Sequence, residues 1–167
     1  MARSAGLTGF LSAAEFALGR VSGPGGLVAA DCVRRWQTEG VVLPNPERLA
    51  VCDHIAPALA AHPGPLASAF ATIEGDLRWQ RRLSADPGNA AFWNGHANAM
   101  ILGPGGLEVR DDLWVGATIM APGTLYDTHT HPPAEVYLPL SPGQWWNAEM
   151  DWTDPGLSGF IYNPPGI

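Results

Sequence analysis

Four side chains that could bind a metal and move a proton lie close together in the C-terminal part of the chain: His129, His131, Glu135 and Tyr137. On an extended strand, residues two apart point to the same face, so both imidazoles should face one way. Glu135 follows across the Pro132–Pro133 bend, which can bring its carboxylate back toward them. Two imidazoles and one carboxylate form a nitrogen and oxygen site suited to Zn²⁺, Fe²⁺ or Mn²⁺. The alternative is a set of exposed polar residues on a sheet edge.

The elements that must position these residues differ between the two halves of the chain. Residues 7–83 are rich in Ala and Leu at helical spacing, whereas residues 92–163 carry Trp, Tyr, Val and Ile in short runs divided by Gly and Pro. This predicts an α+β protein with helices first and an antiparallel sandwich or barrel second. The expected strands are Ala97–Leu102, Leu107–Arg110, Leu113–Met120, Val136–Leu140, Gln144–Met150 and Gly159–Tyr162.

Helix-breaking and helix-capping residues suggest where the helices begin and end. A breaker at Ser22–Gly26 should separate a first helix from a second, and Asn45 should cap a third that has Pro46 in its first turn. Pro57 should kink the last turn of this third helix. The expected helices are Leu7–Leu18, Leu27–Gln37, one that begins after Asn45, and Pro65–Leu83.

Composition narrows the classes of function. The chain of 167 residues has a formal net charge of −7, which argues against a nucleic-acid partner because such proteins need clustered cations. Its nine basic residues are all Arg, so Schiff-base chemistry on a Lys is excluded. No apolar run is long enough for a membrane span, and Glu15 interrupts the apolar N-terminal stretch, so we expect neither membrane insertion nor a secretory signal. A cytoplasmic protein, with Cys32 and Cys52 as free thiols, is the expectation.

The metal-site segment resembles the first conserved motif of the cupin superfamily. That motif runs from a glycine through His-x-His and a glutamate to a second glycine, and here Gly123, His129, His131, Glu135 and Gly143 follow the same order. The last gap is seven residues instead of about six. The resemblance implies a β-barrel around one divalent metal ion that is bound by the two histidines and the glutamate.

The end of the chain resembles the start of the second cupin motif. Pro164-Pro165-Gly166 matches its Pro-x-Gly core, and Gly159 stands one residue closer than the pattern asks. The fourth ligand, a histidine, would lie two positions beyond Ile167. We therefore expect a barrel that is incomplete at the C-terminus, weakened metal affinity, and little or no activity for this form of the chain.

Within the cupins, the chain is similar to the dimethylsulfoniopropionate (DMSP) lyases of the Q type from about Phe92 to Ile167, including His131-Pro-Pro-Ala-Glu-Val-Tyr137. The resemblance implies an N-terminal helical extension over residues 1–90 and a cupin-like antiparallel β-barrel over residues 91–167. It also implies a lyase that cleaves DMSP to acrylate and dimethyl sulfide by β-elimination, with Fe²⁺, Zn²⁺ or Mn²⁺ as cofactor.

The same resemblance implies roles for individual aromatic residues. Tyr137 would be the catalytic base, and Tyr126 would be a second functional tyrosine that touches the substrate. A sulfonium group favours aromatic faces, so Trp145 and Trp146 are candidates for substrate binding. The alternative for each is ordinary packing within the barrel or between helix and barrel.

Two other functions remain open at this level. The same ligand set serves other cupin enzymes, such as dioxygenases and sugar isomerases, and a non-enzymatic cupin would bind a small ligand without turnover. The tyrosine two residues past the glutamate and the tryptophan-rich strands favour the lyase. The oligomeric state, including a homo-oligomer, is not determined by the sequence.

Overall fold

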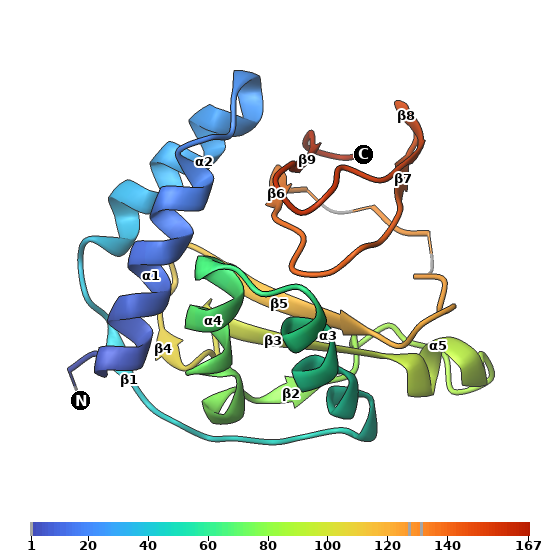
Figure 1. Cartoon of the computed structure of the whole chain (residues 1–167), viewed down its shortest axis with the longest axis horizontal. Helices are drawn as coiled ribbons and strands as arrows, with labels where there is room; N and C mark the ends of the chain where they lie inside the picture. The colour runs from blue at the N-terminus through green and yellow to red at the C-terminus, as the bar shows by residue number, and fades with distance from the viewer. Residues whose placement is uncertain (1, 127, 131) are drawn as a thin grey trace.

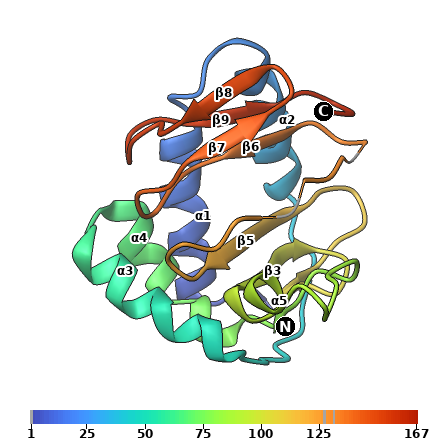
Figure 2. The same ribbon diagram turned by 90° about the vertical axis from the view of Figure 1, so that its right-hand side faces the viewer.

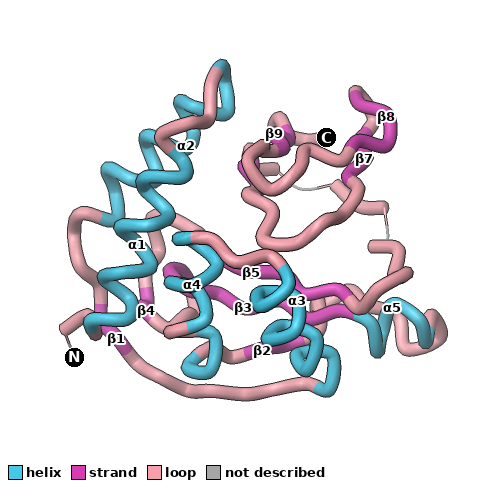
Figure 3. Tube along the Cα trace, viewed as in Figure 1, coloured by secondary structure: helices cyan, strands magenta, loops and turns pink. Residues whose placement is uncertain are grey.

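The computed structural model describes residues 2–126, 128–130 and 132–167. Helices dominate the first half of this described chain and strands the second, as Figure 3 shows, so the predicted α+β class is confirmed. The helices are α1 (Ala5–Leu18), α2 (Gly23–Trp36), α3 (Ile55–Ala61), α4 (Pro65–Ala71) and α5 (Ala90–Gly95), with 3-10 turns η1 (Ala50–His54) and η2 (Glu74–Asp76). The strands are β1 (Val41–Val42), β2 (Trp79–Gln80), β3 (His96–Gly103), β4 (Glu108–Val109), β5 (Val115–Met120), β6 (Glu135–Tyr137), β7 (Trp145–Asn147), β8 (Met150–Thr153) and β9 (Ile161–Asn163).

The main sheet is built around β3, which pairs with three other strands (Figure 1). Strand β5 runs antiparallel along β3, with His96 opposite Met120 and Asn98 opposite Thr118. Strand β2 pairs antiparallel with Asn98 and Ala99 of β3, while β4 pairs with the end of β3 in parallel and carries β1 on its outer edge. The parallel pairing differs from the predicted antiparallel meander, because the chain after Gly103 loops back on itself and then runs beside the end of β3 in the same direction as β3.

The remaining strands form two separate ladders above this sheet. Strands β6 and β9 pair antiparallel, as do β7 and β8, and Figure 2 shows them as one layer across α2. In the described chain no ladder joins these strands to β5, so they do not close into the expected barrel. The segment between β5 and β6 forms no strand in its described residues, and it therefore leaves the two layers without a shared edge.

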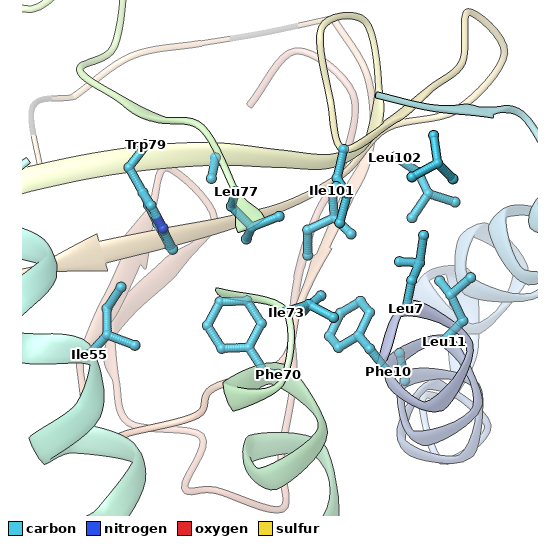
Figure 4. Close-up of a cluster of buried hydrophobic side chains, with 14 of the residues drawn as sticks. Leu7, Phe10, Leu11, Ile55, Phe70, Ile73, Leu77, Trp79, Ile101 and Leu102 are labelled. Atoms are coloured by element: carbon cyan, nitrogen blue, oxygen red, sulfur yellow. The ribbon is translucent and has the colours of Figure 1, made fainter. Parts of the chain in front are cut away.

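The hydrophobic core lies between the main sheet and helices α1, α3 and α4 (Figure 4). Helix α1 begins at the cap Ser4, whose Oγ accepts a hydrogen bond from the Leu7 amide at 3.1 Å. Phe70 of α4 meets the Trp79 ring edge-on, with centroids 6.4 Å apart. The largest fully buried side chains include Trp36, Trp79, Phe92, Leu7, Ile73, Leu77, Ile101 and Leu102. Both halves of the chain contribute to this one core.

Three predicted features of the first three helices are wrong, and each error has a local cause. The expected breaker instead opens α2, because Pro24 suits a first turn that lacks amide partners. No helix begins at Asn45, because the Glu47 amide donates to Leu77 O and the Trp79 amide donates to Glu47 O in a strand-like bridge. Pro57 lies in the first turn of the short α3, where it can be accommodated, so it does not kink a last turn.

The fourth predicted helix and the fifth predicted strand also differ from expectation. Helix α4 ends at Ala71, and the chain beyond it turns so that Trp79 can pair beside Ala99 in the sheet. The strand expected over 144–150 is a hairpin, in which Trp145 lies opposite Thr153 and Asn147 opposite Met150. In both cases pairing with another segment outweighs the local pattern.

Strand β3 presents two chemically different faces. Ala97, Ala99 and Ile101 are buried on the side of the helices. His96, Asn98 and Met100 alternate with them and therefore point to the opposite side. This opposite side carries the candidate functional site.

The N-terminal arm is fastened to the sheet by a buried ion pair. Glu108 of β4 is fully buried and accepts two hydrogen bonds from Arg3, Nε to Oε2 at 2.6 Å and Nη2 to Oε1 at 2.8 Å. The Gly40 amide donates to the same carboxylate at 2.8 Å, and Arg110 Nη1 lies 3.5 Å from it.

Among the described helices, none is both long and apolar enough to cross a bilayer.

Candidate active site

The loop after β5 is held against the start of β3 by a close backbone approach. The Ala121 amide donates to Gly95 O at 2.8 Å, and the Thr124 amide donates to Ala121 O at 3.1 Å. A Cβ on Gly95 would lie well inside van der Waals contact of the Thr124 side chain, so a glycine is needed there. This approach places Tyr126 over the junction of α5 and β3.

Aromatic rings surround Tyr126. Phe92 and His96 meet its ring nearly edge-on, with centroids 4.9 Å and 5.8 Å away and interplanar angles of 74° and 70°. His129 lies on a third side, with its ring centroid 5.2 Å from that of Tyr126. The predicted metal ligand His129 and the predicted substrate-contacting Tyr126 are therefore neighbours.

His96 supports this cluster from a fully buried position on the site face of β3. Its Nδ1 donates to Phe92 O, its Nε2 accepts a hydrogen bond from the Arg82 amide at 3.0 Å, and its ring stacks on Phe92 at 3.7 Å. Both ring nitrogens are thus engaged by protein atoms, and the side chain is fully buried. His96 is consequently a packing residue and not a metal ligand.

Glu135 and Tyr137 lie on one face of β6, as their spacing predicts. The Tyr137 hydroxyl donates a hydrogen bond to Glu135 Oε2. Burial, and then this hydrogen bond and the negative charge of Glu135, raise the pKa of Tyr137 far above its usual range. Tyr126 also raises the pKa of Tyr137 and Arg82 lowers it, so both lie close enough to interact with it electrostatically.

The predicted metal ligands are only partly covered by the described residues. His131 lies outside them, and within the described chain no group of three His, Cys, Asp or Glu side chains converges. His129 and Glu135 supply an imidazole and a carboxylate, donor types that suit Zn²⁺, Fe²⁺ and Mn²⁺. The donor chemistry therefore fits a divalent ion, and the binding of one stays a prediction.

The two predicted tryptophans are adjacent on β7. Trp146 is 47% exposed, while Trp145 is half-buried and lies beside Gly143. Between described residues, no ring contact joins either indole to Tyr126 or Tyr137. Their part in substrate binding stays a prediction.

Sequence reasoning missed the side chains of β3 and β5 that support Tyr126. Asn98 Nδ2 donates to the Tyr126 hydroxyl at 3.0 Å, and Thr118 Oγ1 donates to Asn98 Oδ1 at 2.8 Å. The signal was present as polar residues at alternate positions of an otherwise apolar strand, His96 and Asn98 between Ala97 and Ala99. Their partner could not be identified, because it lies in a loop far along the chain.

Comparisons with known proteins agree with this architecture. A chain from the crystal structures of the DMSP lyases RdDddP and RnDddQII superimposes with a TM-score of 0.73 at 22% identity, covering 97% of this chain and 83% of that one. The DMSP lyase DddQ from Ruegeria pomeroyi DSS-3 superimposes with a TM-score of 0.77 at 19% identity, covering 98% and 83%. At such identities the likeness establishes a shared fold. No curated protein matches the chain by sequence.

The sequence profile of one enzyme family covers most of the chain. The DMSP lyase profile matches residues 28–167, which include the whole cluster around Tyr126, His129, Glu135 and Tyr137. Family membership indicates a lyase that acts on a small molecule. The chain belongs to the DMSP lyase family.

Proposed function

We propose that this protein cleaves DMSP to acrylate and dimethyl sulfide by β-elimination at the cluster formed by Tyr126, His129, Glu135 and Tyr137. The observation that carries the proposal is the pairing of a half-buried tyrosine with a carboxylate on β6, within electrostatic reach of Tyr126. The His129 ring beside Tyr126 adds a metal-binding group to the same place. The proposed base Tyr137, the candidate ligands His129 and Glu135 and the hydroxyl of Tyr126 thus lie near one another.

The chemistry requires a proton to leave the carbon beside a carboxylate, where acidity is very weak. Deprotonated Tyr137 takes that proton, the C–H electron pair forms the new double bond, and the C–S bond breaks so that dimethyl sulfide leaves with its electron pair. A divalent ion bound by His129, His131 and Glu135 would supply positive charge to stabilise the carboxylate of the transition state. Tyr126 would hold the substrate carboxylate by a hydrogen bond.

The native environment of Tyr137 explains why its proton is held tightly in the absence of other charges. Its hydroxyl donates to Glu135 and is largely shielded from water, and both effects favour the neutral phenol. Arg82 acts in the opposite direction by favouring the phenolate. A base in this position therefore needs nearby positive charge.

The primary test is headspace measurement of dimethyl sulfide from the full-length protein supplied with DMSP and, separately, with Fe²⁺, Mn²⁺ or Zn²⁺. We expect release that is lost on chelation and restored by one of these ions. Absence of dimethyl sulfide under all three conditions would rule out the lyase. Metal content measured after gel filtration, in the native protein and in His129→Ala, tests ion binding independently of turnover.

The tyrosine base is tested by Tyr137→Phe, which removes one oxygen from a packed ring. We expect turnover to fall at least about 100-fold, as for loss of a general base, with metal content unchanged. Tyr162→Phe is the matched control, because Tyr162 pairs opposite Val136 on the other face of the ladder and packs against Gly25 of α2. Retained activity in Tyr137→Phe would remove this tyrosine from the mechanism.

A further inference from the structure

Asn98 connects the main sheet to the candidate site. It lies on the site face of β3, directly opposite Thr118 of β5, and reaches up to the Tyr126 hydroxyl. The contact joins residues that are 28 positions apart in the chain. The Tyr126 ring is already confined by Phe92 and His96, so Asn98 contacts the one atom of Tyr126 whose hydrogen can still rotate.

The hydrogen bonds around Asn98 fix which group donates and which group accepts at the Tyr126 hydroxyl. Thr118 Oγ1 donates to Asn98 Oδ1, which leaves the Asn98 amide group to donate from Nδ2. The Tyr126 oxygen accepts that hydrogen bond, so its own O–H must be donated to a different acceptor. A phenol used as an acceptor on one side is therefore left as a donor on the other.

We propose that Asn98, oriented by Thr118, is a positioning residue that turns the Tyr126 hydroxyl into a hydrogen-bond donor directed at an anionic substrate. This inference rests on the proposed function, in which the substrate carries a carboxylate. A carboxylate oxygen only accepts hydrogen bonds, so a hydroxyl donor binds it and a hydroxyl directed toward Asn98 does not. Asn98 thus helps the site to select an anionic group without touching it.

The decisive substitution is Asn98→Asp, which keeps size and shape but replaces the donor by a second acceptor. The Tyr126 hydroxyl should then donate to Asp and turn away from the substrate. Loss of one hydrogen bond to a charged group lowers kcat/KM by about 10- to 100-fold. Asn94→Asp is the matched control, because Asn94 is exposed on α5 and its side chain donates to Ala90 O within its own helix.

A double substitution separates positioning from general damage. In a Tyr126→Phe background there is no hydroxyl left to orient, so Asn98→Asp should have no further effect on kcat/KM. An equal loss in both backgrounds would overturn the proposal, since it would mean that Asn98 acts through the sheet. Full activity of Asn98→Asp with Tyr126 intact would also overturn it, because the direction of the Tyr126 hydroxyl would then not matter for turnover.

A measurement without substrate keeps the test independent of the lyase reaction. The Asn98 side-chain amide, assigned by its disappearance in Asn98→Asp, should shift in the NMR spectrum on Tyr126→Phe substitution. If the native protein releases no dimethyl sulfide, the proposed function fails and this shift alone decides whether Asn98 binds Tyr126. An unshifted amide would overturn the positioning role even in an active enzyme.

Discussion

Substituting Arg3 by Met removes one partner of the buried ion pair that fastens the N-terminal arm to the sheet. Arg3 makes two short hydrogen bonds to Glu108, whose side chain is 0% exposed while that of Arg3 is 10% exposed. Methionine retains much of the aliphatic packing of arginine but none of its charge. The substitution therefore leaves the buried negative charge of Glu108 with fewer hydrogen-bond donors and less positive charge beside it.

The size of the effect follows from the remaining partners of Glu108. Removal of one member of a buried pair typically costs 3–5 kcal/mol, because the other charge stays buried. Here the Gly40 amide at 2.8 Å and Arg110 at 3.5 Å still compensate Glu108 in part, which lowers the expected cost to about 2–3 kcal/mol. For a chain of this size, this corresponds to a decrease in Tm of roughly 5–10 °C.

The lowered pKa of Glu108 determines how the destabilisation by Arg3→Met should change with pH. Burial acts to raise the pKa of Glu108, but the hydrogen bonds from Arg3 and Gly40 outweigh it and hold that pKa below its ordinary value. A lowered folded-state pKa contributes stability above the unfolded-state pKa near 4.3, and this contribution is lost as pH falls through the folded-state value. The destabilisation by Arg3→Met should thus be full near pH 7 and shrink below about pH 4.

Urea unfolding followed by circular dichroism at several pH values measures this difference. Arg34→Met is the matched control, because Arg34 pairs with Asp31 on the surface with side chains 70% and 46% exposed. Such a pair contributes about 0–1 kcal/mol. If Arg3→Met costs no more than Arg34→Met near neutral pH, the buried pair does not stabilise the fold more than a surface pair does.

Three further predictions concern packing and thiol chemistry. Gly95→Ala should lower Tm by several degrees and reduce turnover, because its methyl group would overlap Thr124; Gly75→Ala, which meets no neighbouring atom, is the control. Burial raises the pKa of Cys32 to about 11, so its alkylation near pH 8 should be at least about tenfold slower in the native than in the urea-unfolded protein. Ile101→Ala, at a side chain that is 1% exposed, should cost about 2–5 kcal/mol in urea unfolding.

The part of the fold that could be predicted is the part that depends on neighbouring residues. The spacing of Leu7, Phe10 and Leu11 predicts a helix with one buried face, and α1 has that face in the core. The boundary at Asn45 failed although its local signals were good. The bridge between Glu47 and Arg78 takes the chain through this region in an extended form, and no local pattern indicates that pairing.

In the candidate site, too, some contacts follow from the spacing of neighbouring residues and others depend on distant segments. Glu135 and Tyr137 share a face because alternate residues of any strand do, and their contact was predictable from spacing. Tyr126 lies beside Phe92 and His96 only because the loop after β5 passes over Gly95. The spacing of these residues along the chain does not predict that the loop passes over Gly95.

The sequence by itself determined the class of fold, the face shared by the residues of β6, and the donor types available for a metal ion. These follow from backbone geometry and side-chain chemistry over a few adjacent positions. Only the tertiary structure decided that Asn98 meets Tyr126 and that Arg3 meets Glu108, across 28 and 105 positions. Contacts at such separation depend on how the whole core packs, since the loss of chain entropy on closing a long loop must be offset by burial elsewhere.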